Sequence, residues 1–242
     1  MKKLALAHLL FFPLLVTLIT PVCASVKIQA VIGQDVHVVF DFESINSTLY
    51  TEIVQQGVFN VSTIPQTIVK NLEERNLTDV TWGYDPEVEM FNDATKSIHV
   101  DFYLYGSDIV SLTSNKTTRN RIYNVRTDWR NFHVNLTNEF SLDFTEYFNE
   151  PVDEWQRINN YTLNAKKHPA YYYNFTDSNT FDPLFYFVLP ATAINVHAVG
   201  DTIIFELPPS FEDSLLNSPF LILGAIIVLL IIVFSLYRKI RK

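Results

Sequence analysis

The chain has 242 residues, of which 48% are hydrophobic, and its 26 acidic residues outnumber its 18 Lys and Arg residues. The resulting net charge of −8 argues against a nucleic-acid-binding protein, because phosphates require a basic surface. Six glycines and one cysteine leave little material for a phosphate-binding loop or a disulfide framework.

An apolar run at residues 4–19 follows two lysines, and small residues precede Ser25. This pattern predicts a secretory signal peptide over residues 1–24 that is removed before Ser25. The alternative is an uncleaved membrane anchor, although the run is shorter than the roughly 20 residues that a spanning helix needs. Lipid modification of Cys23 is a third interpretation. Cleavage at the expected place would leave a mature chain without cysteine.

The segments that follow the signal alternate apolar and polar residues. Residues 26–31 and 36–42 flank a short glycine-containing turn and predict a β-hairpin. Residues 98–104 show the period of two that is typical of a strand with one face in water. Between them, apolar residues at helical spacing predict a helix that begins near Thr63, with Pro65 in its first turn.

The second half of the chain continues this pattern. A second short helix is expected at 152–159, after a proline. Residues 194–199 and 202–207 surround Gly-Asp and predict another hairpin, which two prolines end. The polar stretch 114–120 fits either a linker between two lobes or a glycosylated loop within one domain. We therefore expect residues 25–210 to form a mainly β, antiparallel, sandwich-like domain with one or two short helices.

The carboxyl end carries a second apolar run, at residues 218–237. Its length and lack of charge predict a transmembrane helix, preceded by a stalk at 211–217 and followed by a basic tail at 238–242. The basic tail predicts a cytoplasmic C-terminus and an extracellular position for the preceding domain. A buried helix, a glycolipid-anchor signal and an archaeal sorting tail were weighed as alternatives. The basic ending argues against a glycolipid anchor.

The extracellular part is acidic and rich in glycosylation sequons. Two Lys and Arg residues precede the first apolar run and four follow the last, which leaves 12 against 26 acidic residues and a charge of −14. Seven Asn-X-Ser/Thr sequons occur where roughly three would arise by chance, which indicates N-glycosylation. The predicted acceptors are Asn46, Asn60, Asn76, Asn115, Asn135, Asn160 and Asn174.

A glycosylated asparagine must point to water, so its alternate neighbours on a strand must point inward. Within 132–136, Asn135 outward predicts an outward His133. Within 171–175, Asn174 outward predicts an outward Tyr172. The residues then expected in the core are Phe132, Val134, Leu136, Tyr171, Tyr173 and Phe175.

Many sequons, no mature cysteine and a basic tail after an Ile-rich apolar run together resemble an archaeal single-pass cell-surface glycoprotein. The resemblance covers the two ends and the sequons alone. It implies a cell-membrane location with the N-terminus outside and the C-terminus in the cytoplasm. Residues 25–210 show no motif of a characterised family.

Sequence signals for catalysis are few. The histidines of the mature chain lie far apart in sequence, without the spacing of a metal site: His37, His99, His133, His168 and His197. Residues 85–89 place carboxylates at alternate positions but lack the glycine of a calcium loop, which favours a solvated acidic turn. We assign no catalytic, cofactor or metal residue. The three tryptophans are interpreted as core residues.

Arg119, Arg121, Arg126 and Arg130 form the one local excess of positive charge in the acidic domain. Their planar guanidinium groups form a candidate patch for an anionic ligand. The alternative is pairing within the domain, with a carboxylate such as Asp128.

These observations predict a membrane-anchored surface glycoprotein that acts as a structural, adhesive or accessory-subunit module. Its expected partners are the lipid bilayer, through residues 218–237, and other membrane or surface proteins. Two alternatives stay open: an anchored extracellular hydrolase, and a ligand-binding receptor subunit of a transporter. A cleft with converging carboxylates or histidines would favour the hydrolase, and a cleft between two lobes the receptor.

Overall fold

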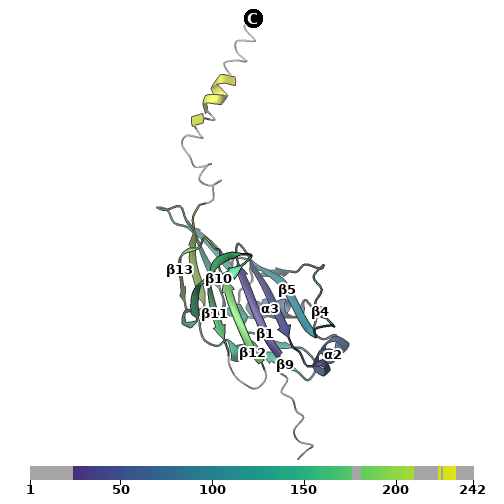
Figure 1. Cartoon of the computed structure of the whole chain (residues 1–242). Coiled ribbons are helices and arrows are strands. Elements are labelled where there is room, and N and C mark those ends of the chain that lie inside the picture. Colours follow the sequence, from purple (N-terminus) through teal and green to yellow (C-terminus); the bar gives the residue numbers. More distant parts are fainter. Residues whose placement is uncertain (1–23, 176–180, 210–222, 225, 233–242) are drawn as a thin grey trace, which may run out of the picture.

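The computed structural model describes residues 24–175, 181–209, 223–224 and 226–232 (Figure 1). The β-domain is mainly strand with few helices, as predicted. Its strands are β1 (Ala24–Ile32), β2 (Val36–Glu43), β3 (Thr81–Gly83), β4 (Phe91–Asn92), β5 (Ser97–Tyr105), β6 (Val110–Ser114), β7 (Arg121–Arg126), β8 (His133–Asn135), β9 (Ser141–Asp143), β10 (Gln156–Leu163), β11 (Lys166–Asn174), β12 (Phe181–Val188), β13 (Ile194–Val199) and β14 (Thr202–Leu207). Its helices are α2 (Ser47–Gln56), α3 (Thr63–Glu74), α4 (Phe144–Tyr147) and the 3₁₀ turns η2 (Asp128–Arg130) and η3 (Val152–Glu154).

The strands form three sheets. Sheet A has eight strands in the order β10-β11-β12-β1-β2-β5-β3, with β4 also paired to β5. Sheet B has the order β13-β14-β7-β6, and β8 pairs with β9. All pairs are antiparallel except β1 with β12, which run parallel. This departs from the antiparallel arrangement expected from sequence, because β12 reaches the free edge of β1 from a separate meander, β10-β11-β12.

One hydrophobic core lies between the sheets and the helices. On β2, every second side chain from Val36 to Phe42 is almost completely buried, and β5 alternates in the same way. The same cluster takes in Phe205 of sheet B, Ile53 of α2 and Ile68 of α3. Both long helices therefore cover the inner side of sheet A. The opposite side of sheet A carries the side chains that alternate with the buried ones along each strand.

The local predictions succeed where the period of the sequence is clear. The two hairpins are confirmed as β1–β2 and β13–β14, and the helix near Thr63 is confirmed as α3. The helix expected at 152–159 is wrong: only the three residues of η3 are helical, and β10 then pairs with β11. Asn159 and Asn160 are weak helix formers, and the residues on either side of them, Ile158 and Tyr161, pair with β11. Helix α2 was missed, although Asn46 Oδ1 caps it by accepting from the Thr48 amide at 2.8 Å.

The face predictions from the sequons are mostly confirmed. Phe132, Val134 and Leu136 are buried, and His133 is exposed. Tyr171 is also buried. The other three aromatic residues of that run, Tyr172, Tyr173 and Phe175, are all half-buried, so their alternation is weaker than predicted.

The structure does not support the predicted transmembrane helix. Within the described ranges, no helix is both long and apolar enough to cross a bilayer. Residues 223–224 and 226–232 are helical. The remainder of 218–237, the predicted signal peptide up to residue 23 and the basic tail lie outside the described residues.

Candidate binding face

The side of sheet A that faces away from the core, here called the outer face, combines aromatic and charged side chains. Strand register places three outward residues of β2 opposite three of β5. His37 lies opposite Tyr103, Val39 opposite Asp101, and Asp41 opposite His99. All six are half-buried, so the outer face is neither a dry core nor a fully solvated surface.

Two histidines and two aspartates form a connected network on this face. His37 Nε2 lies 2.7 Å from Asp101 Oδ1, and His99 Nδ1 lies 2.6 Å from Asp41 Oδ1. His99 Nε2 is 4.0 Å from Asp101 Oδ2, which links the two pairs. The hydrogen bond to Asp41 raises the pKa of His99 above its usual 6.5, although burial opposes this shift. Strand pairing thus joins histidines that are far apart in sequence.

This network is not arranged as a metal site. In the described part of the chain, no group of three or more His, Cys, Asp or Glu side chains is placed to hold a metal ion.

Three aromatic rings stack beside the network. The His37 and Tyr103 ring centroids are 4.4 Å apart with planes inclined by 12°, and those of Tyr103 and Tyr105 are 6.1 Å apart. Gly83 of β3 lies opposite Tyr103, and a Cβ there would be only 3.4 Å from the Tyr105 ring. Glycine therefore leaves room for Tyr105 to lie across the edge of the sheet. Tyr105 is 38% exposed.

Carboxylates from three elements influence the ionisation of Tyr103. Burial raises the pKa of Tyr103, and the negative charges of Asp101, Asp35 and Asp85 raise it further. Asp101 belongs to β5, Asp35 to the β1–β2 turn and Asp85 to the segment after β3. We call this group the acidic–aromatic patch, and it consists of Asp35, His37, Asp85, Asp101, Tyr103 and Tyr105.

A second aromatic group lies on β10, β11 and β12. The Tyr186 ring centroid is 4.8 Å from that of Tyr161 and 5.7 Å from that of Tyr172. The Tyr161 hydroxyl donates to Gln29 Oε1 at 2.7 Å, and the Tyr172 hydroxyl donates to Gln156. Strand register runs from Tyr172 through Tyr186 and Gln29 towards Asp101, so both aromatic groups share one continuous face.

One sequon, Asn174 of β11, lies on this face, two residues along the strand from Tyr172. Five predicted acceptors are exposed and two, Asn46 and Asn115, are half-buried. In both half-buried residues, Oδ1 accepts a hydrogen bond from a backbone amide. A glycan would be attached to the other side-chain atom, Nδ2, which takes no part in that hydrogen bond. None of the seven sequons falls in β1, β2, β3, β5 or β12. The central strands of the outer face therefore carry no attachment point for a glycan.

The four arginines of the predicted anionic-ligand patch have different surroundings. Arg130 is buried, with Nη2 2.8 Å from Asp201 Oδ1, and it donates to the Glu150 carbonyl. Burial lowers the pKa of Arg130, and Asp201 opposes that shift. Arg126 pairs with Asp128 at 3.2 Å, which is the intramolecular alternative.

Arg119 and Arg121 lie at the turn between β6 and β7, where Arg119 is exposed and Arg121 half-buried. The structure therefore does not direct all four guanidinium groups to one surface. The sequence places Trp129 and Trp155 correctly in the core, and Trp82 packs at its edge.

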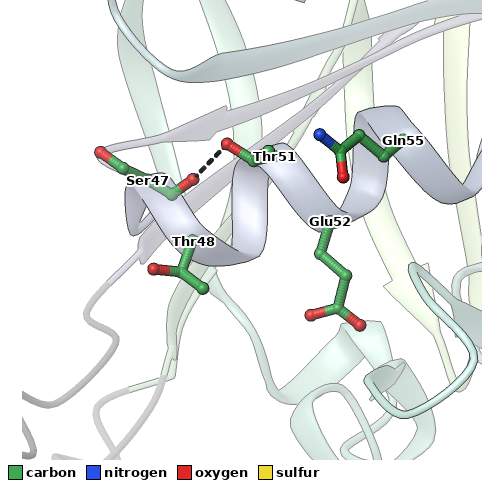
Figure 2. Close-up of a pocket in the computed structure, with 5 residues that line it drawn as sticks. All are labelled: Ser47, Thr48, Thr51, Glu52 and Gln55. Carbon is green, nitrogen blue, oxygen red and sulfur yellow. Dashed lines mark hydrogen bonds between the residues drawn. The ribbon is translucent and has the colours of Figure 1, made fainter.

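A shallow hollow lies on α2 (Figure 2). It is lined by Ser47, Thr48, Thr51, Glu52 and Gln55, all from this one helix. Thr51 donates to the Ser47 carbonyl at 2.7 Å. The hollow adjoins the Asn46 sequon and contains a single carboxylate, so it lacks the converging groups that would favour a hydrolase.

Comparison with known proteins adds no relative: no family model, curated protein or solved structure matches the chain. The functional argument therefore depends on the outer face itself. Sequence reasoning missed this face because its residues come from strands that pair only after folding. The alternation at 98–104 was the one available signal.

Proposed function

We propose that the chain is a membrane-anchored surface glycoprotein whose β-domain binds another cell-surface molecule through the outer face of sheet A. It would act as an adhesive module or as the accessory subunit of a membrane complex. The observation that carries the proposal is the set of half-exposed histidines, aspartates and tyrosines on the central strands β2, β5 and β12, which contain no sequon. Tyrosine is enriched at protein interfaces because it offers a large apolar ring and a polar end.

The arrangement of the sequons supports this use of the surface. Glycans at the predicted acceptors would cover the ends of the sheets and the region of α2 and α3, since Asn46, Asn60 and Asn76 adjoin these helices. Such glycans hinder close protein contact. The outer face would then be the largest part of sheet A open to a partner.

Anchoring to the membrane is part of the same proposal. Large apolar side chains from Leu223 to Ile232 expose between 49% and 63% of their surface. Leaving this much apolar surface in water is unfavourable by about 25 cal/mol per Å². Four basic residues among the last five would favour a cytoplasmic C-terminus in an inserted chain.

Affinity purification of the full chain from detergent-solubilised native membranes tests the proposal. The variants are Tyr105→Ser on the outer face and Leu112→Ser on sheet B, where Leu112 is 53% exposed. We expect the partner to co-purify with the wild type and with Leu112→Ser, and to be lost from Tyr105→Ser. Recovery of the wild-type chain alone, or equal recovery of the partner with both variants, contradicts the proposal.

A further inference from the structure

We propose that the acidic–aromatic patch binds Lys or Arg side chains of a basic partner protein. This inference rests on the proposed function, because it names the chemistry of the partner for the same face. It needs three properties of the patch: negative charge, hydrogen-bond acceptors without matching donors, and an accessible aromatic ring.

The charge comes from separate elements that the fold brings to one end of the face. Asp101 lies on β5, Asp35 precedes Val36, which pairs with Leu104 of β5, and Asp85 lies two residues after Gly83, which pairs with Tyr103. Their negative potential attracts a cation and raises its rate of association. Lys27, the positively charged residue of the neighbouring strand β1, lies opposite Asp41, which is not part of the patch.

The polar groups of the patch mostly accept hydrogen bonds. Asp85 Oδ1 accepts from the Glu87 amide, which leaves its second oxygen for a ligand, whereas the two oxygens of Asp101 face His37 and His99. Lys and Arg are donors only and match such a surface, whereas a sugar hydroxyl is both a donor and an acceptor. The balance of donors and acceptors therefore favours a cationic side chain over a neutral glycan.

Tyr105 supplies the aromatic surface. A guanidinium or ammonium group over an aromatic ring is attracted to the ring's electron-rich face. The domain already uses this contact internally, since the Arg130 guanidinium lies 5.0 Å from the Trp155 ring centroid and the Lys96 ammonium 4.9 Å from that of Tyr50. At the patch, the partner would supply the cation.

Charge also argues against two other occupants. A second copy of the chain would bring an extracellular domain of charge −14 to an acidic surface, which is repulsive. An anionic lipid surface would be repelled in the same way. A basic protein is thus the occupant that the electrostatics favour.

The test measures binding of a labelled peptide of alternating Arg and Gly to the full chain in zwitterionic nanodiscs, with a citrulline peptide as the uncharged control. The double variant Asp35→Asn/Asp85→Asn removes two patch charges without changing side-chain size. The matched control, Glu73→Gln/Glu146→Gln, removes two exposed charges elsewhere. We expect the patch variant to bind the Arg peptide at least tenfold more weakly, Tyr105→Ser several-fold more weakly, and the control within twofold of wild type.

Equal weakening by the patch and control variants would show attraction by bulk charge alone and would overturn the inference. No weakening by the patch variant would do the same. Binding of a neutral oligosaccharide that depends on Tyr105 and not on Asp35 and Asp85 would identify a sugar-binding face instead. Thermal melts establish that each variant is folded.

Capture of the native partner separates this inference from the proposed function. If Tyr105→Ser loses the partner while Asp35→Asn/Asp85→Asn keeps it, the cationic chemistry is wrong and the binding face stands. If all outer-face variants keep the partner, the proposed function fails as well.

Discussion

The two faces of sheet A are made by alternate residues of the same strands, yet they differ in composition and exposure. On the inner face of β2, Val38 and Phe40 are completely buried and contact only the core. On the outer face, His37 and Asp41 are half-buried and pair with side chains of β5. The inner face provides stability by removing apolar surface from water. The outer face retains polar groups, as is usual for the side of a sheet that faces water, and it is the face for which we propose a binding role.

The largest difference between the faces should appear in stability. Phe40 packs against Phe102, Phe132 and Phe144, so Phe40→Ala would leave a cavity in the inner layer. We expect a loss of about 3–5 kcal/mol in the free energy of unfolding. Val39→Ala, one position along and on the outer face, should cost about 1 kcal/mol or less. Urea denaturation of both variants measures the difference, and equal losses would contradict the assignment of the two faces.

Among the residues that the structure describes, Arg130 is the one buried charged side chain, and it offers a second test. Arg130 is buried, and removing the Asp201 carboxylate by Asp201→Ala leaves its charge without an anionic partner. We expect a loss of about 2–3 kcal/mol, below the usual 3–5 kcal/mol for a broken buried pair, because the Asp201 side chain is 37% exposed. Glu154→Ala, an exposed carboxylate on η3, should change stability by less than about 0.5 kcal/mol. If Asp201→Ala is as mild as Glu154→Ala, the pair does not hold Arg130.

The histidine network should produce a smaller effect that depends on pH. The pKa of His99 is raised in the folded state, because protonated His99 is stabilised by Asp41, with a further contribution from Asp101. Its contribution to stability is therefore complete below pH 6.5 and is lost as the pH rises through the raised folded value. The size should be below about 1 kcal/mol, since the His99 side chain is 39% exposed.

Melting temperatures between pH 5.5 and 8.5 measure this contribution for the wild type and His99→Gln. The wild type should melt higher than the variant at the acidic end, and the gap should close towards the alkaline end. A gap that is constant or that widens with pH would mean that Asp41 and Asp101 do not stabilise the protonated form of His99 in the folded state.

The sequence predicts the strands in which apolar and polar residues visibly alternate. It does not predict features that depend on the pairing of strands far apart in the chain. The β1–β2 hairpin is local, because a short turn sets its register. The His37–Asp101 contact joins residues 64 positions apart, and no spacing in the sequence reveals it. Helix α2 was missed because it is short and its apolar stripe is narrow, with only Tyr50 and Ile53 buried.

The sequons were the sequence feature that helped most to predict which residues face outward. Asn135 identified the buried neighbours of its strand correctly. The positions of all seven acceptors, taken together with strand order, then showed that the central strands of the outer face contain no sequon, although Asn174 on β11 shares that face. Strand order was needed for that step, since the parallel β1–β12 pair that joins the two aromatic groups was not predicted.

The most direct test of the central claim places a glycan on the outer face. Lys27→Asn with Gln29→Thr creates a sequon on β1 and leaves every residue of the acidic–aromatic patch unchanged, and Lys27→Asn with Gln29→Ala is the control without a sequon. If the outer face binds the partner, the glycosylated variant should capture at least tenfold less of it from solubilised membranes, while the control should capture nearly as much as the wild type. Undiminished capture by a chain shown by mass to carry the added glycan would contradict the account.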